Sequence, residues 1–380
     1  MSGQNKNFPW SNGFLLLVVI AGFAARLLIA TRGHNYDLES YQVVSGIVDQ
    51  GGNVYASTDR YNYGPVWFNI LHGLHLLSGH NETVFRYLIS GFLSLVDVGI
   101  FLVLWRQYGK AAAAYFFLNP ISIIISGYHS QFDNLAILLG LWSVLLMKDE
   151  FDQPIGRRKL WGLLVLGLSL TTKHVLFAFP FWLAVKQRGL LQKLGVILIP
   201  VSIFVLSFVP YWPAGGQGIV QNVFHYKSAH HDYYYFYRLF VPPFVQMLLD
   251  SQTLWFFLLA LFAFFCKQKN ALESLLFYTA VLVATSPATT NQYLAIPVPF
   301  VATHVNPFTV MYTATGLLHL LLDYDGLHLT GSIFGKLTAS SEVPIFMLCF
   351  GLVWATWRES LIVILRRCIS EARRQFGFEK

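Results

Sequence analysis

The chain has 380 residues, of which 55% are hydrophobic and 12% are charged, and its formal net charge is +7. Its apolar residues occur in runs of roughly 15 to 22, which is the length needed to cross a bilayer and is not the pattern of a soluble domain. Lys and Arg fall in short clusters between these runs instead of forming one basic surface, so no nucleic-acid partner is expected.

The apolar runs predict an all-α integral membrane protein. The first run, Phe14 to Ala30, is too long for a secretory signal and lacks a cleavage site, so we expect it to be a retained span. Basic clusters mark the segments expected on the cytoplasmic side. They lie at Lys6, at Arg106 and Lys110, at 148–159, at 186–193, at Lys267 and Lys269, and from Arg366 onward.

Pairs of apolar segments between successive basic clusters predict about 12 transmembrane helices (roughly 10 to 13) in one polytopic domain, residues 1–380, with both termini cytoplasmic. Three long segments then face the other side, namely 32–83, 212–250 and 323–343. The chain contains no P-loop motif, which argues against a single-chain ATP-driven pump. Its three cysteines are far apart and indicate neither a disulfide framework nor a metal site.

The first outside segment carries two carboxylates, Asp37 and Glu39, directly after the first span. In an extended backbone, residues two apart point to the same face, so we expect this pair to act together. Neighbouring acids raise each other's pKa, which suits a general base. A solvated loop pair without a catalytic role is the alternative.

A polar hinge interrupts the apolar sequence at residues 127–134 (Gly-Tyr-His-Ser-Gln-Phe-Asp-Asn). A simple tight turn requires Gly and Asn, but it does not require His129, Gln131 and Asp133 together. Because polar groups at membrane depth are costly, these three side chains are expected to line a cavity.

Cationic side chains are predicted on the same side of the membrane as Asp37. Lys173 and His174 follow the next outward span, and His225, Lys227 and Arg238 lie in the tyrosine-rich second long segment. Cations beside a carboxylate base suit a reaction with an anionic phosphate leaving group. The tyrosines alone would also fit interfacial anchoring.

Two charged residues fall inside predicted spans. Arg26 lies toward the outer end of the first span and Asp97 lies within the second, so we expect them to pair and fix the two helices. A proton relay through Asp97 is the alternative interpretation.

The order of these motifs resembles that of the GT-C glycosyltransferases, most of all the dolichyl-phosphate-glucose-dependent glucosyltransferases of asparagine-linked glycosylation. The resemblance rests on residues 37–39, on Tyr61-Asn62-Tyr63-Gly64-Pro65, on the 127–134 hinge, and on Lys173-His174 ahead of Pro180-Phe181. Residues 218–238 also look like a segment of that family. Residues 41–43 and 291–293 are similar to the first GPI mannosyltransferase, and the latter replace a His-Glu-Lys of the glucosyltransferases.

The resemblance implies an inverting transfer of a hexose, glucose before mannose, from a polyprenyl- or dolichyl-phosphate sugar to a lipid-linked or membrane-associated acceptor. It implies Asp37 as the base and Glu39 as its helper. The expected substrate-binding residues are His129, Gln131, Asp133, Tyr63 and Gln292. The expected donor-phosphate contacts are Lys173, His174, His225, Lys227 and Arg238.

The resemblance implies no cofactor and no metal, although an acidic pair near a phosphate is able to recruit Mg²⁺ or Mn²⁺. The expected location is a bacterial plasma membrane or the endoplasmic reticulum membrane, with the active site facing outside or the lumen. A multi-span transporter or lipid flippase is a second functional class, and Arg26, Asp97 and the broken helices would then form its path. A non-catalytic membrane scaffold is a third class, but it would need no buried His, Gln and Asp at the hinge.

Overall fold

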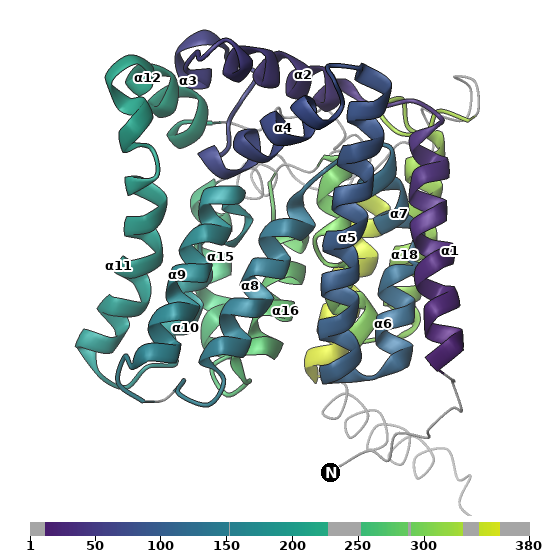
Figure 1. The fold of residues 1–380 in the computed structure, drawn as a ribbon. Coiled ribbons are helices and arrows are strands. Elements are labelled where there is room, and N and C mark those ends of the chain that lie inside the picture. The colour runs from purple at the N-terminus through teal and green to yellow at the C-terminus, as the bar shows by residue number, and fades with distance from the viewer. Residues whose placement is uncertain (1–11, 152, 227–251, 288–289, 330–341, 358–380) are drawn as a thin grey trace, which may run out of the picture.

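The computed structural model describes residues 12–151, 153–226, 252–287, 290–329 and 342–357, and every regular element within them is a helix. The helices form a bundle of upright elements, closed at one end by short helices that lie across it (Figure 1). We call this end the cap. It consists of α2, α3, α4 and α12 together with the turns between them.

The first half of the bundle surrounds α5, the longest continuous helix of this half, which packs against α1, α6, α7 and α8. The bounds of these helices are α1 Asn12–Ala30, α5 Glu82–Tyr108, α6 Lys110–Phe117, α7 Pro120–Gly127 and α8 Asp133–Met147. Leu118 and Asn119 separate α6 from α7, and the two helices are bent by 46° relative to each other. Proline at the first turn of α7 starts that helix, because its missing N–H is not needed there.

The second half begins with α9, which packs closely on α8 and α11. Its helices are α9 Arg157–Thr172, η1 His174–Leu176, α10 Phe179–Val185, α11 Leu190–Leu206, α15 Gln252–Phe265, α16 Ala271–Ala284, η4 Asn291–Ala295, α17 Val298–Thr303 and α18 Pro307–Leu322. The chain bends by 119° between α9 and the η1–α10 segment. This break places Lys173 beside the cap rather than inside a straight span.

The predicted outside segment 32–83 is largely helical. It contains α2 Tyr36–Asp49, α3 Val54–Ser57 and α4 Pro65–Leu77, and it meets η2 Val209–Tyr211, α12 Trp212–Gly218 and η3 Ile219–Phe224. The cap has an aromatic core of its own, in which the Trp67 and Phe132 rings stack at 4.1 Å between centroids. Since Phe132 belongs to the 127–134 hinge, this core fixes the cap onto the bundle.

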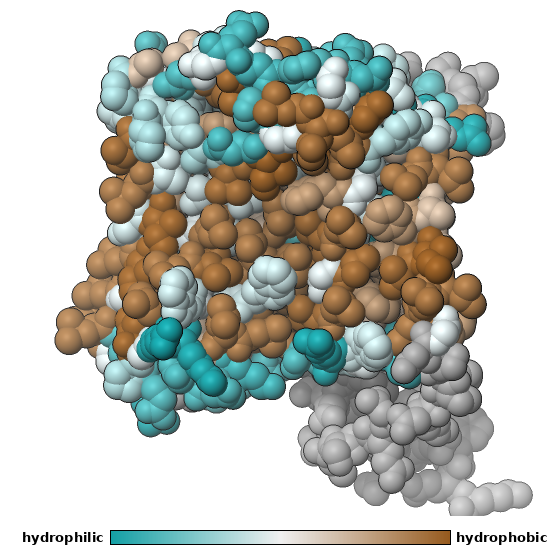
Figure 2. Space-filling model, viewed as in Figure 1, coloured by the Kyte–Doolittle hydropathy of each residue, from teal (hydrophilic) through white to brown (hydrophobic). Residues whose placement is uncertain are grey.

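The membrane-protein prediction is confirmed by the surface of the bundle. A broad apolar belt surrounds its middle and polar residues gather at both ends (Figure 2). Three described helical segments, α1, α5 and 190–224, are long and apolar enough to cross a bilayer, and there are up to five if each bent pair counts as one span. Five further apolar helices are shorter, so the expected number of about 12 spans stays a prediction. The terminal residues lie outside the described ranges. The location of both termini on the cytoplasmic side therefore stays a prediction.

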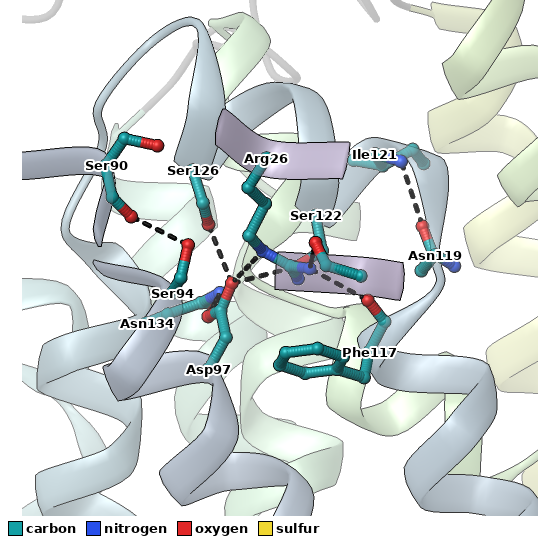
Figure 3. A network of polar contacts seen from close by, with 11 residues as sticks. Arg26, Ser90, Ser94, Asp97, Phe117, Asn119, Ile121, Ser122, Ser126 and Asn134 are labelled. Atoms are coloured by element: carbon teal, nitrogen blue, oxygen red, sulfur yellow. Dashed lines mark hydrogen bonds and ion pairs between the residues drawn. The ribbon is translucent and has the colours of Figure 1, made fainter. Parts of the chain in front are cut away.

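Arg26 and Asp97 form a fully buried ion pair at 2.9 Å, which confirms the predicted link between α1 and α5 (Figure 3). The guanidinium also donates to the carbonyls of Gly22 and Phe117 and to the Ser122 hydroxyl. The carboxylate accepts from Ser126 at 2.8 Å and Asn134 at 2.6 Å. The pair therefore connects five helices, α1, α5, α6, α7 and α8, which supply its hydrogen-bond partners.

Candidate active site

Asp37 lies in the first turn of α2, where the cap meets the bundle. Asn35 starts this helix as its N-cap residue, and its side-chain oxygen accepts from the Asp37 amide at 3.2 Å. The Asn35 amide group also donates to Asp37 Oδ2 at 2.9 Å. One side chain thus fixes both the backbone and the carboxylate of Asp37.

Glu39 points away from Asp37, and the expectation of an extended segment with both acids on one face is wrong. The segment is an α-helix, in which residues two apart lie roughly 200° apart around the axis. The Glu39 carboxylate is half exposed and lies 3.5 Å from the Arg60 guanidinium on the cap surface. Asp37 is therefore part of the site, whereas Glu39 is not.

The polar hinge 127–134 lies directly below Asp37 and is buried. His129, Gln131 and Asp133 are each 1% exposed, and they stand between the end of α7 and the start of α8. Gly127 permits this position, because a Cβ there would lie 2.6 Å from the Arg26 carbonyl oxygen. Ser130 adopts a left-handed conformation with φ 53°, which reverses the chain between His129 and Gln131.

Gln131 connects the acid to a cation. Its amide group donates to Asp37 Oδ2 at 2.5 Å, and its carbonyl oxygen accepts from Lys173 Nζ at 3.1 Å. This pair of contacts determines which end of the amide faces which partner, because an ammonium group only donates. Among the described residues, the hydrogen bonds to the carboxylate converge on Oδ2, which leaves Oδ1 to accept a proton from a substrate.

Lys173 is buried and forms an ion pair with Asp133, at 2.7 Å between Nζ and Oδ2. The ammonium also lies over the rings of Tyr63 and Phe132, at 5.0 and 4.7 Å from their centroids. These contacts stabilise a desolvated cation, which would otherwise be expensive to bury. A positive charge is therefore held next to Asp37 with little freedom to move.

His129 presents a hydrogen-bond donor to the site. The Asn35 amide group donates to His129 Nδ1 at 3.1 Å, which assigns the proton of the neutral ring to Nε2. Burial lowers the pKa of His129 to about 4, so the ring is neutral at physiological pH. Within the described part of the chain, buried Nε2 has no partner.

Three further buried oxygens of the hinge, Ser130 Oγ, Asp133 Oδ1 and Asn134 Oδ1, also have no hydrogen-bond partner among the described residues. Buried polar groups in native proteins are rarely left unpaired. Four such atoms between His129 and Asn134 are therefore available to pair with a polar ligand.

Burial raises the pKa of Asp37, while the Asn35 hydrogen bond and the Lys173 charge oppose that increase. The raised pKa makes the carboxylate a stronger base than an exposed aspartate. A stronger base is what removal of a proton from a hydroxyl group requires.

An acidic turn that sequence reasoning missed forms the opposite side of the site. Asn291 links His319 to Asp323, with 2.7 Å to each. Burial and the charges of Asp37 and Asp323 raise the pKa of Asp325 to about 6, which shows that this turn is within electrostatic reach of Asp37. In the sequence, Asp323 and Asp325 at the start of the 323–343 segment were the features that could have indicated this acidic turn.

The other predicted residues are placed less centrally. The Tyr63 ring lies 4.9 Å from Phe132 and 6.4 Å from His174 between ring centroids. Gln292 is partly exposed, and its neighbour Asn291 makes the contacts described above. His225 is exposed at the end of η3, and Lys227 and Arg238 lie outside the described residues.

Two cavities lie near the ends of the helices. One of about 860 Å³ lies at the end of the bundle opposite the cap and is lined by Lys148, Lys186, Lys193 and Lys267 among others, but by no acid or histidine. The other, about 510 Å³, lies between α4, α9 and η2 and is lined by Pro65, Ile70, Thr171 and Tyr211 among others. Of these two cavities, the smaller one comes nearer to Lys173, because Thr171 lies two residues before it in the chain.

The all-α part of the fold prediction is confirmed, and the comparison with solved structures shows that this bundle with its helical cap has an ArnT-like fold. The chain resembles ArnT from Cupriavidus metallidurans bound to undecaprenyl phosphate, with a TM-score of 0.51 and 14% identity over 91% of this chain and 78% of that one. The apo form of ArnT matches with the same TM-score and identity, over 90% and 75% of the two chains. No protein-family model matches the chain, and no curated protein matches it.

Proposed function

We propose that the protein is an inverting GT-C glycosyltransferase that moves a sugar from a polyprenyl-phosphate donor to a lipid-linked or other membrane-associated acceptor. The observation that carries this proposal is the linkage of Asp37 to buried Lys173 through Gln131. The ArnT-like fold supports it, because ArnT has been crystallised with undecaprenyl phosphate.

In the proposed reaction, Asp37 Oδ1 removes the proton from an acceptor hydroxyl while that oxygen attacks the anomeric carbon of the donor sugar. The bond from the anomeric carbon to the phosphate oxygen breaks on the opposite face, which inverts the configuration. The departing phosphate carries the negative charge, and Lys173 stabilises it. His129 and Ser130 supply hydrogen bonds to sugar or acceptor hydroxyls.

The smaller cavity suits the carrier. Its lining includes proline, isoleucine and tyrosine side chains, and it reaches Thr171 close to Lys173. We place the isoprenoid chain there, so that its phosphate meets the ammonium. We keep glucose, and then mannose, as the first sugars to test, because the motif resemblance favours them.

The distribution of basic residues supports placing the cap on the non-cytoplasmic side. Arg106, Lys148 and Lys186 all lie at the end of the bundle opposite the cap. By the positive-inside rule that end faces the cytoplasm, in a bacterial plasma membrane or the endoplasmic reticulum.

A transporter or flippase remains the second functional class, but the arrangement of Arg26 and Asp97 gives little support for a transport path. Its proposed path would use Arg26 and Asp97, and these side chains are paired with each other and with Ser122, Ser126 and Asn134 inside the bundle. Groups that are fully occupied by neighbouring helices are poorly suited to exchange substrates or protons.

The decisive experiment is sugar transfer by the purified protein in nanodiscs, with synthetic polyprenyl-phosphate-glucose and polyprenyl-phosphate-mannose as donors. We expect Asp37→Asn to lower turnover by about 10²- to 10⁴-fold and to keep donor affinity. Glu39→Gln is the matched control, since it removes a carboxylate from the same helix on its exposed face. Loss of donor binding with Lys173→Met would support the phosphate contact.

The proposal fails if neither donor reacts with several lipid acceptors and neither binds in a thermal-shift assay. It also fails if Asp37→Asn and Glu39→Gln reduce turnover equally.

A further inference from the structure

A group of histidines gathers around Asp49 on the cap, away from the candidate active site. Asp49 is the last residue of α2, His72 and His75 lie in the last two turns of α4, and His80 lies in the turn before α5. Asp37 and Asp49 are separated by 12 residues of helix, or about 18 Å along its axis. The cluster is therefore a separate feature of the cap.

Three nitrogens face the Asp49 carboxylate. His72 Nδ1 lies 2.7 Å from Oδ1, His75 Nδ1 lies 2.7 Å from Oδ2, and His80 Nδ1 lies 3.4 Å from Oδ2. Ligand atoms of Asp49, His75 and His80 all lie within 4.8 Å of one another. The His75 and His80 rings meet edge to face, with centroids 4.7 Å apart.

The backbone brings His80 to this position by an unusual route. Gly79 and His80 both have positive φ, 59° and 61°, so the chain turns back on itself immediately after α4. This conformation is uncommon for a residue with a side chain and has an energetic cost. This turn brings the His80 imidazole next to the Asp49 carboxylate.

We propose that Asp49, His75 and His80 bind a divalent transition-metal ion, with Zn²⁺ as the best-fitting ion. Two imidazoles and one carboxylate are ligands that Zn²⁺ accepts, and bonds of 2.0 to 2.1 Å place tetrahedral ligand atoms about 3.3 Å apart. The Asp49–His80 separation of 3.4 Å already matches this value, and the Asp49–His75 separation of 2.7 Å widens to it when the proton between them leaves and the ion enters. The His80 side chain is 59% exposed and is free to adjust. Water fills the fourth position.

His72 takes a supporting part in this site. It holds Asp49 Oδ1 while Oδ2 faces the ion, which is the hydrogen bond that ligating carboxylates usually receive. The ion joins the end of α2, the end of α4 and the start of α5. It thereby stabilises the cap and takes no part in sugar transfer.

The test uses the full chain in nanodiscs, purified with a tag that contains no histidine and treated with a chelator. Co²⁺ serves as the spectroscopic probe, because tetrahedral coordination gives intense visible absorption. We expect one Co²⁺ per chain, displacement by Zn²⁺, and a saturable rise of the thermal midpoint. Because His80 is exposed and the other two histidines still pair with Asp49, His80→Ala should fold and lose this saturable binding.

His72→Asn should weaken binding by about 10- to 100-fold without abolishing it. His328→Ala removes a histidine outside the cluster and should bind Co²⁺ like the wild type. The proposal is overturned if the chelator-treated wild type shows no tetrahedral Co²⁺ spectrum, or if His80→Ala binds as the wild type does. In that case the histidines serve only to tie α4 to α2. Because the readout is metal binding, its outcome is independent of the proposed transfer reaction.

Discussion

Asp37 and Lys173 are joined through one side chain, that of Gln131, whose amide group donates to the acid and accepts from the cation. The two charged residues come from α2 and from the break after α9, so the hinge residue is what relates them in space. A base and a phosphate-binding cation held in fixed relation are what a displacement reaction requires.

Replacing Gln131 with Met keeps the length of the side chain and removes both hydrogen bonds. Hydrogen bonds to charged groups contribute about 1.5 to 3 kcal/mol, so kcat/KM for transfer should fall by roughly 10- to 100-fold. Gln42→Met, at a partly exposed position of α2, is the control and should leave the rate unchanged. Equal rates for the two variants would contradict the bridging function of Gln131.

Asn35→Ala should change the pH dependence of transfer. Asn35 opposes the burial that raises the Asp37 pKa, so its removal raises this pKa further. Asp37 must be ionised to accept a proton, and the acid limb of the kcat/KM profile should therefore move to higher pH. The variant also loses a helix cap, at a cost of about 1 kcal/mol.

The matched control for Asn35 is Asn270→Ala, which removes the N-cap of α16 away from Asp37. It should lower stability by a similar amount and leave the pH profile in place. If both variants shift the acid limb alike, the effect comes from general destabilisation.

Asp97→Ala should destabilise the bundle strongly, because it leaves the Arg26 guanidinium buried without its counter-ion. The expected loss is about 3 to 5 kcal/mol, measured by chemical denaturation in detergent. The double variant Arg26→Met/Asp97→Leu buries no charge and should lose less than Asp97→Ala alone. A double variant that is less stable than Asp97→Ala would contradict the structural assignment.

Gly64→Ala should disturb the site from the cap, because a Cβ there would collide with the Thr171 carbonyl oxygen. Overpacking of this kind costs about 1 to 3 kcal/mol and would displace Tyr63 from Lys173. Gly73→Ala, in the same helix α4 with open space around it, should instead stabilise the protein by up to about 1 kcal/mol. Thermal midpoints and transfer rates of the two variants test this contrast.

The linear sequence was sufficient for features that depend on composition and local order. Apolar runs predicted the membrane bundle, the 127–134 hinge marked a buried polar break, and the isolated charges Arg26 and Asp97 predicted their own pairing. These predictions succeed because burying an unpaired polar group is costly wherever it occurs in the chain.

Tertiary structure alone decided which residues share the site. Glu39 is turned away because α2 is helical. Asn35, followed by Asp37 and Glu39 in the first turn, was the local signal for this helix, but it does not indicate which residues Asp37 meets. The acidic turn at Asp323 reaches Asp37 from almost 300 residues away, and Asp49 meets His75 and His80 across two helices. These contacts between residues far apart in the sequence depend on how the packed helices are placed relative to one another. No local pattern of residues encodes that placement.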